Sequence, residues 1–173
     1  MGEGILGVLV VLAGVVGCGS GENGAADSAP VLPFASATMR LLAGTDTVRL
    51  LAELAESPDQ QSLGLMERHR LADTAGMLFV YPSEQPGSAA FWMFRTRIPL
   101  DIAFVDSLGV IRAIQQMVPC PSDFAQACPT YPPGLPYRAA LEANAGYFAR
   151  NKLAIGSRIV LGDTSRRVNA AAR

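Results

Sequence analysis

The segment from Phe91 to Ile102 (FWMFRTRIPLDI) carries the residues most able to do chemistry, because a lone tryptophan stands there beside arginines and an aspartate. Period-two alternation predicts that its large apolar side chains and those just beyond share the core-facing side of an extended chain, namely Trp92, Phe94, Ile98, Leu100, Ile102 and Phe104. The opposite side would carry Met93, Arg95, Arg97 and Asp101. An aspartate between Leu100 and Ile102 costs stability unless it is solvated or paired. The polar side is therefore either the rim of a ligand pocket or a structural ion pair.

A second carboxylate, Glu142, stands in the segment Leu141–Gly146 (LEANAG) and shares the parity of Ala140, which could turn it to the interior of a sheet. Together with Asp101 it would form the carboxylate pair that glycoside hydrolysis requires. Asn144 can cap a short helix over residues 146–151. Two functional hypotheses follow: a binding or accessory module of the cell envelope, and an envelope hydrolase with Asp101 and Glu142 as acid and base.

The ligand-binding candidates are the polar and aromatic residues of these segments together with one upstream arginine: Arg68, Trp92, Arg95, Thr96, Arg97, Asp101, Glu142 and Asn144. A single tryptophan beside arginine and aspartate suits a glycan or a small anionic ligand. No catalytic residue, cofactor or metal site is assigned, because one histidine and three cysteines form no recognised catalytic or metal-binding spacing. Fourteen Lys and Arg against fifteen Asp and Glu leave a net charge of −1, which gives no basic surface for nucleic acid.

The first residues of the chain predict export. Residues 5–16 (ILGVLVVLAGVV) are an uncharged apolar run, shorter than the roughly 20 residues of a membrane-spanning helix and typical of a secretory signal. The run leads into Val15-Val16-Gly17-Cys18, which resembles the lipobox of bacterial lipoproteins, where cleavage leaves a cysteine carrying fatty acyl groups such as palmitate. We expect a signal peptide over residues 1–17, a lipidated Cys18, and an exported protein tethered to a membrane of the cell envelope. The alternatives are a plain cleaved signal and an uncleaved anchor.

Residues 18–45 are predicted to hold the lipidated cysteine and a flexible linker, since Gly19–Ala37 is rich in Gly, Ser, Ala and Pro. One folded domain is expected over residues 46–164 and a frayed tail over 165–173. If lipid occupies Cys18, Cys120 and Cys128 remain as one pair in an oxidising compartment, which predicts a structural disulfide. A redox-active or metal-binding pair would prefer a Cys-x-x-Cys spacing, which these cysteines lack.

The domain is predicted to be mainly β. Half of the residues are hydrophobic and 17% are charged, which excludes a largely disordered chain. Period-two alternation, apolar runs and Pro or Gly breaks predict strands over residues 46–56, 76–81, 89–94, 100–106, 110–117, 137–143 and 158–161. A short helix should have Ser57 as its N-cap and Pro58 as its first residue, and run to Leu65 or Met66. These elements indicate a compact antiparallel sandwich or barrel with one or two short helices.

Ordered motifs along the domain resemble one known family: Gly64-Leu65-Met66 with Arg68, Gly76–Pro82, Phe91-Trp92-Met93 with Thr96, Ile98–Phe104, Cys128–Pro132 and Leu141–Gly146. From about Val48 to Leu161 the chain resembles the bacterial and archaeal family called domain of unknown function 192. The resemblance implies a compact, mainly β fold of jelly-roll-like type whose members are often exported or lipid-anchored, and it implies no particular activity. The sequence has Phe94 and Arg95 where the family usually has Lys and Asn.

Overall fold

The computed structural model describes Met1 and residues 32–165. The expected signal peptide, Cys18, most of the expected linker and residues 166–173 of the tail lie outside the described residues. In chain order the elements are β1 (Ala35–Ala43), β2 (Asp46–Ala55), α1 (Pro58–Leu63), β3 (Ala75–Gln85), β4 (Phe91–Trp92), β5 (Leu100–Val105), β6 (Ile111–Met117), the 3-10 turn η1 (Ala125–Ala127), β7 (Thr130–Tyr131), β8 (Tyr137–Asn144), α2 (Tyr147–Arg150) and β9 (Arg158–Ser165). Among the described residues, no helix has the length and apolar character needed to cross a bilayer.

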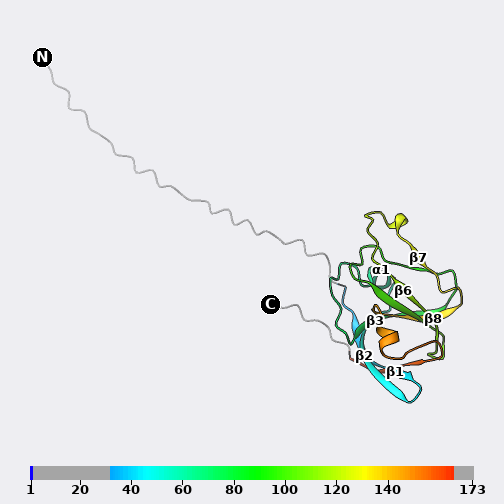
Figure 1. Ribbon diagram of the computed structural model, residues 1–173. Coiled ribbons are helices and arrows are strands. Elements are labelled where there is room, and N and C mark those ends of the chain that lie inside the picture. Colours follow the sequence, from blue (N-terminus) through cyan, green and yellow to red (C-terminus); the bar gives the residue numbers. More distant parts are fainter. Residues whose placement is uncertain (2–31, 166–173) are drawn as a thin grey trace. The chain divides into compact units, whose positions relative to one another are not determined.

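A curled seven-stranded sheet in the order β6-β5-β8-β3-β2-β1-β9 forms a half-barrel, and β4 pairs with β7 in a separate two-stranded sheet (Figure 1). The predicted mainly β fold with two short helices is confirmed. One pair departs from the antiparallel pattern: β3 runs parallel to β2, because α1 and the following loop return the chain to the middle of β2, where Ala75 lies opposite Leu51. At one end the sheet edges meet, where Val110 bridges to Arg158 beside β6 and β9.

Two clusters of buried side chains lie on the two faces of the sheet. The concave core includes Met39 of β1, Leu78 of β3 and Ile111 of β6, together with Phe148 of α2. Strands so far apart in the sheet share one cluster because the sheet curls around it. The convex core joins the outer face of β3, β5 and β8 to the segments that cover it, including Leu65, β4 and the disulfide loop. The candidate site lies on this convex side.

The predicted disulfide between Cys120 and Cys128 is confirmed, with Cα atoms 5.5 Å apart. The predicted strands over residues 100–106 and 110–117 are also confirmed as β5 and β6, which form a hairpin. Its turn is held by the Asp106 carboxylate, which accepts hydrogen bonds from the backbone N–H groups of Leu108 and Val110, both at 2.9 Å.

The expected linker over residues 18–45 is wrong for its last part, because Ala35–Ala43 is strand β1. The Gly-, Ser- and Pro-rich residues before this strand indicated a linker, yet Ala37, Met39 and Leu41 are buried and alternate with exposed Thr38 and Arg40. Pairing with β2 on one side and β9 on the other orders this strand. Tertiary pairing therefore outweighed the local composition.

The predicted face of the Phe91–Ile102 segment is wrong in its first half. Strand β4 contains only Phe91 and Trp92, after which the chain turns, with the Thr96 N–H donating to the Met93 carbonyl at 3.1 Å and Arg95 at φ 56°. The turn breaks the period, so that Met93 is buried and Trp92 is 44% exposed. In β5 the prediction is correct for the convex-core residues Leu100, Ile102 and Phe104. Alternate residues there are buried as well, because β5 lies between two strands with both faces covered.

Candidate ligand-binding site

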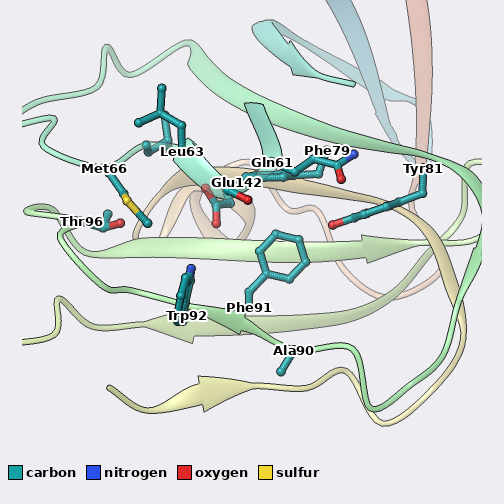
Figure 2. A pocket seen from close by; sticks show the side chains of 13 residues that line it. Gln61, Leu63, Met66, Phe79, Tyr81, Ala90, Phe91, Trp92, Thr96 and Glu142 are labelled. Atoms are coloured by element: carbon teal, nitrogen blue, oxygen red, sulfur yellow. The ribbon is translucent and has the colours of Figure 1, made fainter. Parts of the chain in front are cut away.

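A solvent-open cavity of about 110 Å³ lies on the convex side of the sheet, between α1 with its following turn, β3 and β4 (Figure 2). A space of this size accommodates several waters or a small organic group. The lining residues are Gln61, Ser62, Leu63, Gly64, Leu65, Met66, Phe79, Tyr81, Ala90, Phe91, Trp92, Thr96 and Glu142.

Helix α1 forms one wall, and its N-terminus is fixed by a capping box. The Ser57 hydroxyl accepts the Gln60 N–H at 3.2 Å, and the Gln60 side-chain oxygen accepts the Ser57 N–H at 3.0 Å. The predicted start at Ser57 and Pro58 is confirmed, whereas the helix ends at Leu63 because Gly64 takes φ 48°. Gln61 then ties the helix to the sheet: its Nε2 donates to the Val80 carbonyl at 2.9 Å. The Gln61 amide oxygen thus remains as an acceptor at the cavity.

Glu142 supplies the floor of the cavity. It lies on the central strand β8, directly opposite Met77 of β3 and Ile102 of β5, both of which are fully buried. Glu142 is only 4% exposed, and no cation or hydrogen-bond donor among the described residues pairs with its carboxyl group. Burial raises the pKa of this carboxyl to about 8. Near neutral pH Glu142 is therefore mainly protonated.

Polar atoms of Trp92, Thr96 and Tyr81 surround this carboxyl. Figure 2 shows the Trp92 ring with its indole nitrogen on the edge that faces Glu142, and the Tyr81 hydroxyl directed into the cavity. Phe94 packs against the Trp92 ring with centroids 5.8 Å apart. Burial first, then Tyr137 and Glu142, raise the pKa of Tyr81, so that it remains a neutral phenol.

Aromatic rings make up much of the remaining wall. Phe79 and Phe91 meet edge to face with centroids 4.9 Å apart, and Phe91 continues to Phe104 at 5.7 Å. Because Phe104 belongs to the convex core, this ring contact fixes the inner end of the cavity to the sheet. The cavity thus combines apolar, rigid walls with a small set of polar atoms.

Of the eight ligand-binding candidates predicted from the sequence, the structure brings together Trp92, Thr96 and Glu142. The three arginines lie elsewhere. Arg68 forms a two-pronged ion pair with Glu53 of β2, with both N–O distances at 2.6 Å. The Arg68 guanidinium is therefore bound by Glu53, and neither residue lines the cavity.

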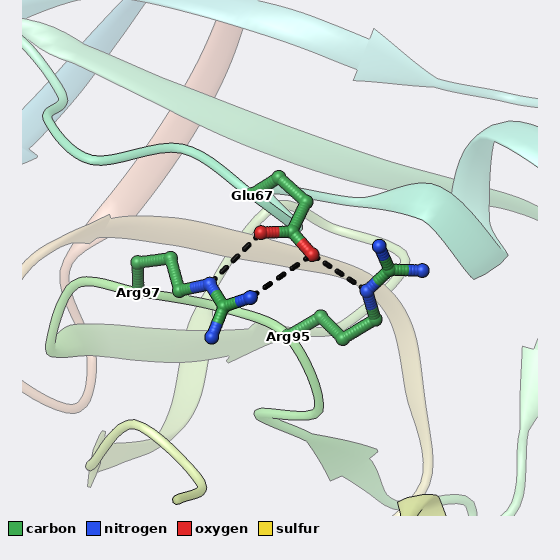
Figure 3. A network of polar contacts seen from close by, with 3 residues as sticks. All are labelled: Glu67, Arg95 and Arg97. Atoms are coloured by element: carbon green, nitrogen blue, oxygen red, sulfur yellow. Dashed lines mark hydrogen bonds and ion pairs between the residues drawn. The ribbon is translucent and has the colours of Figure 1, made fainter. Parts of the chain in front are cut away.

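Arg95 and Arg97 both bind Glu67, beyond the residues that line the cavity (Figure 3). The Nε atoms lie 2.6 Å and 2.8 Å from the carboxylate oxygens of Glu67. These hydrogen bonds, that of Arg97 first, lower the pKa of Glu67. The expected structural ion pair between Asp101 and an arginine is wrong, because the arginines have Glu67 as their partner.

Asp101 and Glu142 lie on opposite faces of the sheet. Asp101 is directly opposite Ala143 of the concave core, whereas Glu142 is opposite Ile102 of the convex core. Asp101 lines an apolar hollow with Ile114, Phe148 and Leu153 instead. The expected acid–base pair is therefore wrong, since two carboxylates on opposite sheet faces cannot flank one glycosidic bond.

Asn144 also serves the fold rather than the cavity. Its Nδ2 donates to the carbonyls of Leu71 at 3.0 Å and Ala72 at 3.2 Å, which ties the loop before β3 to the end of β8. The expected helix cap is wrong, because α2 begins after Gly146 without a side-chain cap.

The sequence reasoning missed Gln61, Tyr81 and Phe91 as cavity residues. Tyr81 follows Met77 and Phe79 at period two, so its side could have been inferred once the face of β3 was known. Gln61 carried no such signal, because its place depends on how α1 packs against β3. Within the described part of the chain, no three His, Cys, Asp or Glu residues gather in a way that could hold a metal ion.

The protein is thus a β half-barrel domain with a small cavity, and a buried acid forms the floor of that cavity. The chain belongs to the family called domain of unknown function 192, described as "Uncharacterized ACR", whose model matches residues 40–161. The predicted resemblance is thus confirmed.

Two solved structures share this fold. One, from Sinorhizobium meliloti 1021, is described as a candidate transcription regulator; it is 32% identical, with a TM-score of 0.68 over 76% of this chain and 97% of that chain. The other, from Novosphingobium aromaticivorans DSM 12444, is described as a protein of unknown function. It is 30% identical, with a TM-score of 0.65 over 76% of this chain and 89% of that chain. No protein with a curated description matches this chain.

Proposed function

We propose that this domain binds a small polar organic ligand in the cavity above Glu142. The observation that carries the proposal is a carboxyl group that is only 4% exposed, faces a solvent-open cavity and has no partner among the described residues. A buried polar group without a partner lowers the free energy of unfolding, so the stability of the fold does not account for its presence. Binding sites keep such groups because a ligand supplies the missing partner.

The lining decides which ligands fit. Among the described residues that line the cavity, Glu142 and Tyr81 are the titratable groups, and neither is a cation. A small anionic ligand is therefore disfavoured, since it would meet no positive charge. A neutral or cationic ligand, such as the terminus of a glycan, would find the Trp92 indole N–H as donor and the Thr96 hydroxyl and Gln61 oxygen as acceptors.

We also propose that the domain works outside the cytoplasm, tethered by lipid to a membrane of the cell envelope. This part rests on the apolar run over residues 5–16 and on the lipobox-like Val15-Val16-Gly17-Cys18. The Cys120–Cys128 disulfide supports it, because such bonds persist in oxidising compartments.

Intrinsic fluorescence tests the binding proposal directly, because Trp92 is the single tryptophan of the chain. A panel of glycan fragments, small alcohols, amines and carboxylates is titrated against the full-length protein while the Trp92 emission is followed. We expect a saturable change with at least one neutral or cationic compound, which Glu142→Gln weakens at least tenfold. Asp101→Asn is the matched control, since it neutralises a buried carboxyl on the other sheet face. No saturable response in the whole panel would overturn the proposal.

A further inference from the structure

We infer that the group which enters the cavity is a small organic ammonium ion, with Glu142 as its counter-ion and the surrounding aromatic rings as its cage. This inference rests on the proposed function and names the chemical class of its ligand. It follows from three properties of the cavity: its charge, its aromatic walls and the count of its acceptors.

The described residues that line the cavity include an acidic one and no basic one. Glu142 lies at the floor, while the nearby arginines are held elsewhere, Arg68 by Glu53 and Arg95 with Arg97 by Glu67. The protein thus places an acid in an apolar setting and gives it no cation. An ammonium group is the simplest ligand that completes this pair, and its attraction to the carboxylate is strengthened by the low local polarity.

Aromatic rings from two elements surround the same space. Phe79 and Tyr81 come from β3, and Phe91 and Trp92 come from β4. The faces of such rings attract cations. Trp92 is half-exposed at the cavity and turns its indole N–H edge toward Glu142, so the attraction for the charged group rests on Phe79, Tyr81 and Phe91.

The acceptors match the donors of a primary ammonium group. Such a group carries three N–H donors and no acceptor. The cavity offers the carboxylate of Glu142, the hydroxyl of Thr96 and the amide oxygen of Gln61, whose nitrogen is already used on the Val80 carbonyl. A carboxylate ligand would find the Trp92 indole N–H and the Tyr81 and Thr96 hydroxyls as donors, but no cation among the described lining residues, and Glu142 would compete with it for those donors.

Proton release follows from this arrangement. Tyr81 of β3 is the titratable group that faces Glu142, Asp101 of β5 faces the other side of the sheet, and β4 and α1 contribute no charged residue to the lining. Since burial keeps Glu142 mainly protonated below about pH 8, a binding cation must displace that proton. Affinity should then rise about tenfold per pH unit between pH 6 and 7 and level off above the pKa of Glu142.

Isopropylammonium chloride and isopropanol provide a matched pair of probes, because they differ chiefly in the charged group. Both are titrated into the full-length protein in detergent at pH 6, 7 and 8 while Trp92 fluorescence is followed, with sodium chloride as the ionic-strength control. Aliphatic amines stay protonated throughout this range, since their pKa lies near 10. We expect saturable binding of isopropylammonium only, tightening about tenfold from pH 6 to 7. Calorimetry at pH 6 in two buffers of different ionisation enthalpy should show about one proton released per cation bound, because Glu142 is then almost fully protonated before binding.

Glu142→Gln should abolish the saturable response and the proton release while the circular dichroism spectrum stays unchanged. Asp101→Asn should keep both. Equal binding of isopropanol, binding without pH dependence, or no saturable response to isopropylammonium would each overturn the ammonium inference. The proposed function would survive these results if another compound of the panel bound at Trp92, and it would fail with the inference if none did.

Discussion

Glu67 and Arg95, which are 28 residues apart, are joined twice. The Glu67 N–H donates to the Arg95 carbonyl at 2.7 Å. The Arg95 Nε donates to the Glu67 carboxylate at 2.6 Å (Figure 3). Both residues take positive φ angles, 60° for Glu67 and 56° for Arg95. Residues other than glycine rarely adopt this backbone conformation, so the double contact holds two strained turns against each other.

This contact fixes the mouth of the cavity. The turn before Glu67 carries Leu65 and Met66, and the turn around Arg95 carries Thr96 and follows directly on Trp92 of β4; all four residues line the cavity. The exposed ion pair of Glu67 and Arg95 therefore holds together the two segments that line the cavity on either side of it.

The first prediction concerns Glu67→Gln. The neighbouring arginines lower the pKa of Glu67 from its ordinary 4.5, so its stabilising effect is present above pH 4.5 and is lost as the pH falls through the lowered value. The melting temperature of the variant should fall below that of the wild type at pH 7 and converge with it at acid pH. Differential scanning calorimetry from pH 3 to 7 measures this.

The same variant should shift the Trp92 emission, because the mouth of the cavity loosens. Arg112→Gln is the matched control, since it breaks another exposed arginine–carboxylate pair, that of Arg112 with Asp106 at 3.2 Å, away from the cavity. A difference in melting temperature between variant and wild type that stays the same at every pH would contradict the role assigned to Glu67. An equal emission shift in the Arg112→Gln control would also contradict it.

The second prediction concerns the stability of Glu142→Gln. Burial raises the pKa of Glu142 from 4.5 to about 8 in the folded state, so between these values the folded protein holds a proton that the unfolded chain has lost. Stability of the wild type should therefore fall as the pH rises from 4.5 to 8, by at most about 1.4 kcal/mol per pH unit from this group. The glutamine variant lacks this contribution and should be the more stable protein at pH 8. Urea unfolding at pH 5, 6.5 and 8 tests this, and equal pH slopes in both proteins would show that Glu142 is not protonated by burial.

The third prediction concerns the disulfide between Cys120 and Cys128. Closing this short loop restricts the unfolded chain, so replacing both cysteines with serine should lower the free energy of unfolding by about 2–3 kcal/mol. Urea unfolding of the purified variant and wild type provides the number. Mass spectrometry of non-reduced peptides should find the two cysteines linked, and two freely alkylated thiols in protein isolated from the envelope would contradict the pairing.

The fourth prediction concerns Cys18, which we expect to become the acylated first residue of the mature protein. Cells expressing the chain in the presence of labelled palmitate should yield a labelled, membrane-bound band. Cys18→Ser should lose the label and release the domain from the membrane fraction. Label that persists in the serine variant would reject the lipobox interpretation.

Local signals in the sequence were enough for several elements, because each signal depends on neighbouring residues alone. Ser57 and Pro58 placed the start of α1 through capping chemistry, and apolar runs bounded by Pro or Gly breaks placed β5 and β6. The disulfide followed from counting cysteines, since only one pair remained once Cys18 was set aside. Ordered motifs in the same region identified the family.

The tertiary structure decided which residues share the site, because this depends on strand register and on partners far along the chain. Shifting β8 by one residue against β5 would move Glu142 to the concave core, so no local pattern could tell whether it met Asp101. Likewise, the turn after β4 reversed the side on which Trp92 lies. The sequence by itself determined most of the elements and the chemistry that each carries, but not strand β1. The register of the sheet and the contact between Glu67 and Arg95 determined that Trp92, Thr96 and Glu142 meet in one cavity.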